Sequence, residues 1–421
     1  MAARRFDRLA LGVLALGVGL RIGFGVFVEP GPLIRDADHY WRLGSALLER
    51  GELSFYPGVP SGFRTPGYPV FLAGVMAVFG PSERAVVVIQ GLLAAVSLWL
   101  NVCSLRLLGV AGLALVLGVA TLSFYPSYVD VIPTIMSENL SLPLMSLVIY
   151  CWARHSRDRR SLDAMLTGLA VGVSTLVRPA SLLLVPALAL ADFLSCRDRF
   201  SWRRWVAATM LSITVLLPWM ARNAAVGKGF VLEDFSSFQA YLCMVSMEPD
   251  FDHQHMPCGD WSEARRVGSA ELSKMVGRPV TIPATYPIDT GTLSAGEIND
   301  LLRAHMIEII RTRPREFLAT LWPRFLILWG DIGNEPTPGR WYLHSAAMLF
   351  TFTVVVAGMF WRRTRREPLA ALAFMLAAYT TATHLPMAPH NRYLWPALLV
   401  MLPAMAAHLV TAVDARGRRV V

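Results

Sequence analysis

Charged side chains are scarce in this chain of 421 residues, since Asp, Glu, Lys and Arg together make up 16% of it. In an average soluble protein they approach a quarter of all residues. Hydrophobic residues make up 54% of the chain, and its mean hydropathy is +0.46. Apolar windows of membrane-spanning length recur along the whole sequence. The composition therefore excludes an ordinary soluble domain and predicts one membrane domain rather than a soluble domain with an anchor.

Lysine is almost absent, with only Lys228 and Lys274, and the net charge of +9 comes from arginine. The arginines gather in short connectors between apolar runs rather than in a stripe on a soluble domain, so we predict no nucleic-acid partner. Positive connectors of this kind mark the cytoplasmic side of a membrane. The clusters are Arg4, Arg5 and Arg8; Arg154, Arg157, Arg159 and Arg160; Arg197, Arg199, Arg203 and Arg204; Arg362, Arg363, Arg365 and Arg366; and Arg416, Arg418 and Arg419.

The five cysteines form no CxxC pair and no zinc-binding spacing. Cys103, Cys151 and Cys196 fall in or beside apolar runs, where we expect them to be plain membrane-core residues. Cys243 and Cys258 both lie in the large outer segment described below, so a disulfide between them is an open alternative if that compartment is oxidising.

The positions of the basic connectors fit an all-α polytopic protein with about ten transmembrane helices and with both termini in the cytoplasm. The basic N-terminus followed by an apolar run is interpreted as an uncleaved first span, because no small-x-small cleavage site follows it. Residues 29–83 and 222–340 then lie outside. The predicted spans are 9–28, 85–106, 108–126, 134–153, 161–178, 180–195, 205–220, 342–360, 368–385 and 393–413.

Two further apolar stretches, 68–79 and 317–330, are too short to cross about 30 Å of hydrocarbon at 1.5 Å per residue. We predict interfacial or re-entrant helices there; counting both as spans would give twelve. The chain then divides into an N-terminal transmembrane module (1–221), an extracytoplasmic cap (222–340) and C-terminal transmembrane helices (341–421).

The cap segment combines an amphipathic helix with a polar stretch. Over residues 299–315 apolar side chains recur at helical spacing, which predicts an amphipathic helix in a small, mostly helical cap that lies on the membrane. A metal site is one interpretation of the polar stretch before it, but a flexible surface loop is the favoured one. The potential ligands are Asp250, Asp252, His253 and His255. The sequence leaves the question of a divalent metal open.

The first outer loop carries two aspartates, Asp36 and Asp38, directly after the first span. If residues 37–49 are helical, Asp36 lies at the N-terminus of the helix, where backbone N–H groups and the helix dipole stabilise an anion. One interpretation is therefore a helix N-cap. The other is a catalytic base at the lipid–water boundary that accepts a proton from an acceptor hydroxyl. Asp38 is the supporting or surface acid.

Three arginines lie at the predicted outer ends of spans, where positive charge is otherwise sparse: Arg178, Arg222 and Arg392. A guanidinium there either snorkels to the interface or binds a lipid-borne phosphate, for which its fork of donors is suited. Arg64, in a proline-rich turn, and Glu138, beside a potential N-cap at Ser137, lie at the same predicted depth. Together with Asp36 they predict an anion site with an acid nearby.

The order and spacing of these residues resemble the GT-C class of integral-membrane glycosyltransferases, in the branch of protein O-mannosyltransferases and lipid A aminoarabinose transferases. The resemblance covers residues 5–230 and returns near residue 390. It rests on Asp36-x-x-x-Tyr40, Arg64-Thr-Pro-Gly-Tyr-Pro69, Ser137-Glu138-Asn139-Leu140, Gly168-x4-Val173 with Arg178-Pro179, Pro218-Trp219-x-x-Arg222-Asn223 and Arg392-Tyr393.

The resemblance implies an inverting transfer of a sugar from a polyprenyl-phosphate donor to an acceptor hydroxyl outside the cytoplasm. Asp36 would be the base, or Asp38 in its place, because Ala37 interrupts the adjacent Asp-Glu pair of the commonest pattern. The implied substrate-binding residues are Tyr40, Arg64, Glu138, Arg178, Arg222, Arg392 and Tyr393.

The implied location is the inner or plasma membrane, and the implied acceptor is a lipid, a glycan or a protein. The resemblance leaves the need for a divalent metal open. Two other classes of function are weighed against this one. A transporter or flippase of lipid-linked intermediates would call for discontinuous helices in two symmetric halves, which the sequence does not contain. A non-catalytic assembly protein would not need the outer arginines.

Overall fold

The structure is a computed structural model that describes residues 2–233, 236–251, 261–282, 293, 295–330, 340–361, 367–387 and 390–417. Within this part of the chain a helix occupies each of the ten predicted spans. These helices are α1 (Ala2–Phe27), α4 (Glu83–Leu107), α5 (Gly112–Phe124), α7 (Glu138–Asp158), α8 (Ser161–Val177), α9 (Leu184–Ser195), α10 (Trp202–Ala225), α15 (Arg340–Phe360), α16 (Pro368–His384) and α17 (Trp395–Gly417).

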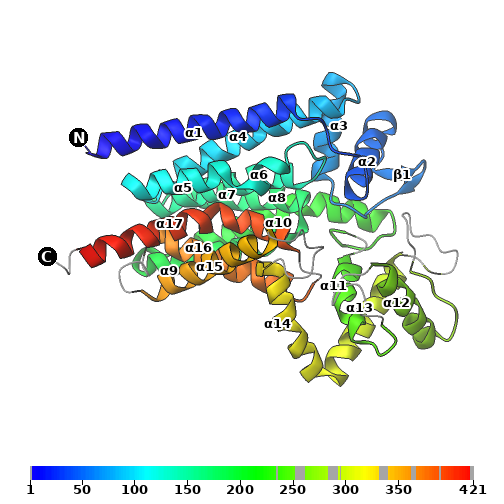
Figure 1. Cartoon of the computed structure of the whole chain (residues 1–421). Coiled ribbons are helices and arrows are strands. Elements are labelled where there is room, and N and C mark those ends of the chain that lie inside the picture. Colours follow the sequence, from blue (N-terminus) through cyan, green and yellow to red (C-terminus); the bar gives the residue numbers. More distant parts are fainter. Residues whose placement is uncertain are drawn as a thin grey trace.

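Among the described residues, four helical segments are long and apolar enough to cross a membrane by themselves: Arg4–Phe27, Glu83–Leu107, Trp202–Ala225 and Arg392–Val413. The remaining predicted spans are helical but shorter or less apolar, and their crossing stays a prediction. The start of α1 and the end of α17 lie at the same end of the bundle (Figure 1), as an even number of crossings requires. Which side of the membrane that end faces stays a prediction.

The other end of the bundle carries the first loop and the cap (Figure 1). The loop holds α2 (Asp36–Arg50), a small antiparallel hairpin of β1 (Ser54–Tyr56) and β2 (Val59–Pro60), and α3 (Gly67–Phe79). The hairpin corrects the all-helical prediction for this loop. It closes over Pro57 and Gly58, and Gly58 has a positive φ of 74°, which glycine tolerates without strain. At 13 residues, α3 is too short to span.

The cap has a hydrophobic core of its own, formed by residues such as Phe238, Tyr241 and Leu302. The predicted amphipathic helix is α13 (Ala295–Thr312), and its buried face packs toward this core. Arg324 of the next helix, α14 (Pro314–Gly330), is 2% exposed and donates to the carbonyl of Cys243 at 2.7 Å. The cap helices are α11 (Ser236–Met244), η3 (Val245–Met247), α12 (Trp261–Val276), α13 (Ala295–Thr312) and α14 (Pro314–Gly330). Short connecting helices are α6 (Pro126–Asp130), η1 (Pro179–Ser181), η2 (Arg197–Arg199) and η4 (Asn391–Leu394).

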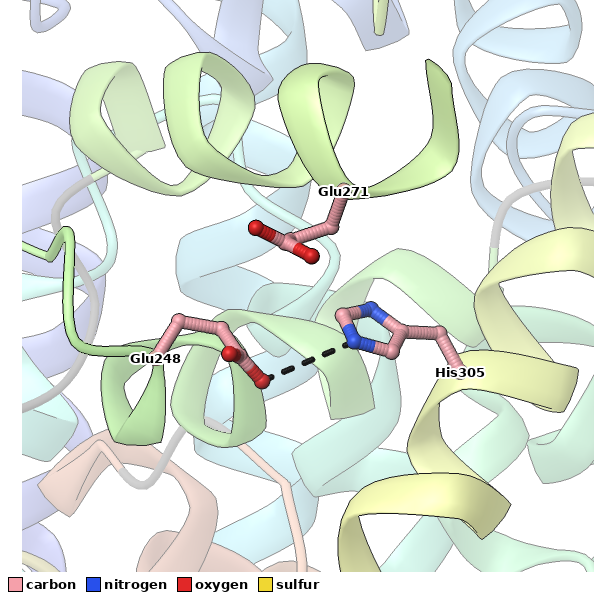
Figure 2. A group of neighbouring side chains, drawn as sticks. All are labelled: Glu248, Glu271 and His305. Atoms are coloured by element: carbon pink, nitrogen blue, oxygen red, sulfur yellow. Dashed lines mark ion pairs between the residues drawn. The ribbon is translucent and has the colours of Figure 1, made fainter. Parts of the chain in front are cut away.

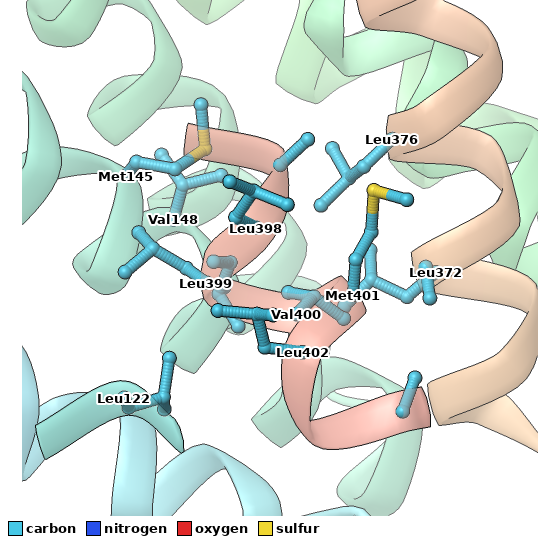
Figure 3. Close-up of a cluster of buried hydrophobic side chains, with 14 of the residues drawn as sticks. Leu122, Met145, Val148, Leu372, Leu376, Leu398, Leu399, Val400, Met401 and Leu402 are labelled. Atoms are coloured by element: carbon cyan, nitrogen blue, oxygen red, sulfur yellow. The ribbon is translucent and has the colours of Figure 1, made fainter. Parts of the chain in front are cut away.

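The bundle packs around α17. Five consecutive residues of this helix, 398–402, are buried, and they meet Met145 and Val148 of α7 and Leu372 and Leu376 of α16 (Figure 3). A helix that is buried over consecutive positions has neighbours on most sides, so α17 is a central element. The C-terminal helices therefore belong to the same bundle as the N-terminal module.

Small residues let other pairs of helices approach closely. A Cβ on Gly168 of α8 would lie 2.1 Å from the carbonyl oxygen of Ala208 in α10, so only glycine fits. Small residues at helix contacts are typical of membrane bundles.

Arg21 of α1 is 3% exposed and donates to the carbonyls of Leu122 and Ser123 at 2.7 and 2.9 Å. It thereby caps the last turn of α5.

Cysteine usage follows the sequence expectation where it is described. Cys103, Cys151 and Cys196 are free thiols. Cys243 is disulfide-bonded. Cys258, the partner that the sequence offered, lies outside the described residues.

Candidate active site

The site begins at the first residue of α2. Arg35, at the N-cap position, has φ 52° and makes no side-chain cap bond. A positive φ is uncommon for a residue other than glycine and is concentrated at functional positions. Asp36 is therefore not the N-cap, which corrects that interpretation. It is the first helical residue, and its carboxylate turns to arginines from distant parts of the chain.

Two guanidinium groups hold Asp36. Arg64 Nη2 lies 2.5 Å from Asp36 Oδ1, and Arg392 Nη2 lies 3.3 Å from Asp36 Oδ2. Burial alone would raise the pKa of the Asp36 carboxyl, but the charges of Arg64 and then Arg392 outweigh it and hold the pKa below its usual value. The side chain keeps 29% of its surface exposed. Asp36 is thus an ionised and still accessible carboxylate.

A second carboxylate lies on the far side of Arg392. Glu138, the first residue of α7, is 4% exposed and lies 2.6 Å from Arg178 Nη1 through its Oε1 atom. The same oxygen lies 3.7 Å from Arg392 Nε. Arg178 is placed by the break between α8 and η1, where Pro179 ends the helix. Arg392 therefore bridges the two acids.

Arginine outnumbers acid in this cluster, which comprises Asp36, Arg64, Glu138, Arg178 and Arg392. These five side chains have a formal charge of +1, and Glu233 is a third carboxylate close enough to raise the pKa of Arg64. The Nε–H groups of Arg64 and Arg392 are buried and make no hydrogen bond to the described residues. Three guanidinium groups with two unused Nε–H donors favour binding of a further anion. The ring centroid of Tyr393 lies 5.6 Å from Arg178 Cζ and 5.8 Å from Arg392 Cζ.

Two hollows meet at Arg392. One reaches into the bundle and combines polar groups near Arg178 with apolar side chains of α7, α9 and α16. Its lining includes Met145, Arg178, Leu184, Leu376, His384, Arg392 and Tyr393. The other is more open and lies on the Glu138 side. Its lining includes Ser127, Asp130, Glu138, Arg392 and Trp395. The cation cluster thus has one face toward the bundle interior and another toward a more open hollow.

The remaining predicted residues lie around the cluster rather than in it. Asp38 lies 3.8 Å from Arg42, and its side chain is 42% exposed, as expected of a surface acid. Tyr40 is buried, and the guanidinium of Arg64 lies 5.3 Å from its ring centroid. Burial raises the pKa of the Tyr40 hydroxyl, so it stays neutral.

Arg222 differs from the prediction that grouped it with Arg178 and Arg392. Its guanidinium donates to the carbonyl oxygens of Ser61 at 2.7 Å and Leu53 at 3.3 Å. These contacts fasten the end of α10 to the hairpin. The described contacts of Arg222 therefore support the loop that carries Arg64, and they do not place it beside Asp36.

The sequence reasoning missed His384, which lines the inner hollow and stacks on Tyr393 with ring centroids 4.7 Å apart. It also missed a group of three potential metal ligands in the cap. Among the described residues, Glu248, Glu271 and His305 are the group that could hold a metal ion (Figure 2). Of the polar loop proposed from sequence, Asp252, His253 and His255 lie outside the described residues.

The comparisons with known proteins concern the fold. The family model described as dolichyl-phosphate-mannose-protein mannosyltransferase matches residues 63–221, which contain Arg64, Glu138 and Arg178. The archaeal oligosaccharyltransferase AglB from Archaeoglobus fulgidus, in complex with an inhibitory peptide and a dolichol-phosphate, aligns over 96% of this chain with a TM-score of 0.54 and 13% identity. Its apo form aligns over 98% with a TM-score of 0.52. The chain has the GT-C glycosyltransferase fold.

The chain spans about half the length of AglB, since the alignments cover 50% and 51% of the two structures. ArnT from Cupriavidus metallidurans in the apo state aligns over 97% of this chain and 78% of its own, with 15% identity. Its TM-score of 0.42 is too low to support the fold assignment. No curated protein sequence matches the chain.

Proposed function

We propose that this protein transfers a sugar from a polyprenyl-phosphate donor to an acceptor hydroxyl, with inversion at the anomeric carbon. The observation that carries the proposal is the position of Asp36 between Arg64 and Arg392, next to the pair of Glu138 and Arg178. An accessible carboxylate beside an excess of guanidinium supplies the two groups that such a reaction needs. These are a base for the acceptor and cations for the leaving phosphate.

The donor phosphate would bind at Arg178 and Arg392. Both line the hollow that reaches the apolar side chains of Met145, Leu184 and Leu376. A guanidinium presents several donors to phosphate oxygens, and the positive charge of the cluster favours the dianion formed when the sugar leaves. The ring of Tyr393 lies within cation–π distance of both guanidinium groups.

The acceptor hydroxyl would approach Asp36 on its exposed side. Its oxygen attacks the anomeric carbon while the bond from that carbon to the phosphate oxygen breaks. The hydroxyl proton passes to Asp36, and the bonding electron pair stays on the phosphate. In the free protein the two arginines make Asp36 a weak base. A donor phosphate competes for Arg392, which raises the basicity of Asp36 when the substrate is bound.

Other details rest on the resemblance and on the family match. The transferred group would be a hexose or a pentose, and the acceptor a lipid, a glycan or a protein. The reaction would take place on the extracytoplasmic side of the inner or plasma membrane. This assignment follows from the predicted topology, in which the first loop and the cap are outside, and from the basic connectors, which are inside.

The test compares Asp36→Asn with Asp38→Asn in membranes supplied with radiolabelled polyprenyl-phosphate hexose. Asp36→Asn keeps the shape of the side chain and removes its basicity, so transfer should fall by about 10²–10⁴-fold, the usual contribution of a general base. Asp38→Asn is the matched control, because Asp38 is exposed on the same helix, and should retain transfer. Full turnover by the Asp36 variant would refute the mechanism. Movement of labelled lipid across the membrane without bond cleavage would indicate a flippase instead.

A further inference from the structure

The cap contains a cluster of potential metal ligands far from Asp36 in the chain. Glu248 follows η3, Glu271 lies on α12 and His305 lies on α13. One ligand atom from each lies within 4.8 Å of the others, and the three side chains converge from three separate elements (Figure 2). We propose that they bind a divalent transition-metal ion, such as Zn²⁺, that fastens the cap. This inference does not depend on the proposed transferase activity.

The distance between Glu248 and His305 already suits a metal ion. Glu248 Oε1 and His305 Nε2 are 3.5 Å apart. Ligand atoms of a tetrahedral Zn²⁺ with bonds of about 2.0–2.1 Å lie about 3.3 Å from each other. Both side chains are buried, at 7% and 6% exposure. Glu271 supplies the third ligand atom, within 4.8 Å of the other two.

The imidazole of His305 is held in the orientation that a metal ligand needs. The hydroxyl of Tyr241, a fully buried residue of α11, lies 2.8 Å from His305 Nδ1. If Nδ1 donates its proton to this oxygen, the lone pair is on Nε2, which faces Glu248. Metal-binding histidines commonly have their other ring nitrogen fixed in this way. The tyrosine thus acts as a positioning residue.

Each carboxylate is already paired with a cationic side chain. Arg313 Nη2 contacts Glu248 Oε1, and Lys274 Nζ lies 2.6 Å from Glu271 Oε1. An ion bound here would share Glu248 with Arg313 and Glu271 with Lys274. The side chains of all three ligands, with those of Lys274 and Arg313, line one hollow of the cap. A cation that enters it therefore competes with Lys274 for Glu271.

The ligand types determine the class of ion. One imidazole nitrogen with carboxylate oxygens suits Zn²⁺ or Mn²⁺, whereas Ca²⁺ and Mg²⁺ prefer oxygen ligands alone. Three protein ligands leave a position for water. One ligand directly follows η3, and the other two lie on α12 and α13. A bound ion would therefore cross-link three segments that otherwise meet through a small apolar core.

The experiment measures Zn²⁺ binding to the purified full-length chain in detergent, by equilibrium dialysis and by the shift of the thermal unfolding midpoint. We expect one saturable ion per chain and a higher midpoint when it binds. His305→Gln should weaken binding at least tenfold. Lys274→Met should tighten it several-fold, because the competing ammonium is gone. Glu308→Gln is the matched control, since this residue lines the same hollow and is outside the ligand set.

The Lys274 variant separates a ligand role from a folding defect, because a misfolded cap does not gain affinity. Unchanged affinity in His305→Gln, or weaker binding in Lys274→Met, would overturn the proposal. A double variant, His253→Ala with His255→Ala, tests the polar loop that the sequence singled out. Loss of binding in that variant with retention in His305→Gln would assign the ion to the loop and reject the cap site.

Discussion

Glu138→Gln removes the charge of the buried acid that Arg178 and Arg392 share. The substitution leaves two guanidinium groups facing one neutral amide, and the formal charge of the cluster rises from +1 to +2. Removing one partner of a buried pair costs about 3–5 kcal/mol. Glu138 is 4% exposed and Arg178 is 17% exposed, so we expect the lower half of that range.

The expected size of the thermal shift follows from the length of the chain. An unfolding entropy of about 2.1 cal/mol/K per residue gives about 0.9 kcal/mol/K for the whole chain, so the midpoint should fall by roughly 3–4 °C. The assay is thermal unfolding in detergent, with variants compared at one scan rate because membrane proteins often unfold irreversibly. A loss of this size is a change in stability that needs no substrate to detect.

A double-mutant cycle identifies the cause of the loss. Arg178→Gln removes the cation that lies 2.6 Å from Glu138, so the double variant should be less destabilised than the sum of the single variants. Contacting residues typically show coupling of about 0.5–3 kcal/mol. Additive losses, or a Glu138→Gln protein as stable as the parent, would show that this pair does not contribute as its geometry indicates.

Two other predictions concern packing and pH. Gly168→Ala should lower stability by about 1–3 kcal/mol, measured as the same thermal midpoint, because its Cβ would meet the carbonyl of Ala208; Gly74→Ala, with nothing within 4 Å, should leave it unchanged. Because the pKa of Asp36 lies below its usual value, its contribution to stability is complete above about pH 4 and is lost as the pH falls through the lowered pKa. Arg64→Gln should move that acid limb to higher pH, and an unmoved limb would contradict the pairing.

The positions of the helices could be predicted from the sequence, because an apolar run bounded by arginine clusters is typical of a transmembrane helix. The hairpin at residues 54–60 was missed, because its strands of three and two residues are too short for a period-two pattern. The candidates Asp36, Arg64, Glu138, Arg178 and Arg392 were found from motif order. The sequence did not show which of these residues form ion pairs, because the pairing depends on how α2, α7 and η4 pack in three dimensions.

Arg222 shows the limit of reasoning from position alone. Its place at the end of an apolar run matched that of Arg178 and Arg392, yet its guanidinium binds loop carbonyls. An arginine at a helix end satisfies carbonyl oxygens as readily as phosphate, and a sequence does not distinguish them. The three potential ligands of the cap, Glu248, Glu271 and His305, were missed because more than twenty residues separate each of them from the next.

Arg21 and the carbonyl groups that accept its hydrogen bonds are synthesised at different times. It is made early, within α1, but the carbonyl oxygens of Leu122 and Ser123 that receive its hydrogen bonds come 101 and 102 residues later. At a translation rate of about 5–20 residues per second, that interval is on the order of 5–20 s. An arginine at the centre of a membrane-spanning helix costs roughly 2.5–3.5 kcal/mol in hydrocarbon, and Arg21 lies nearer the end of α1, at Phe27, than its middle. Arg21 therefore has these carbonyl acceptors only after α5 has been synthesised.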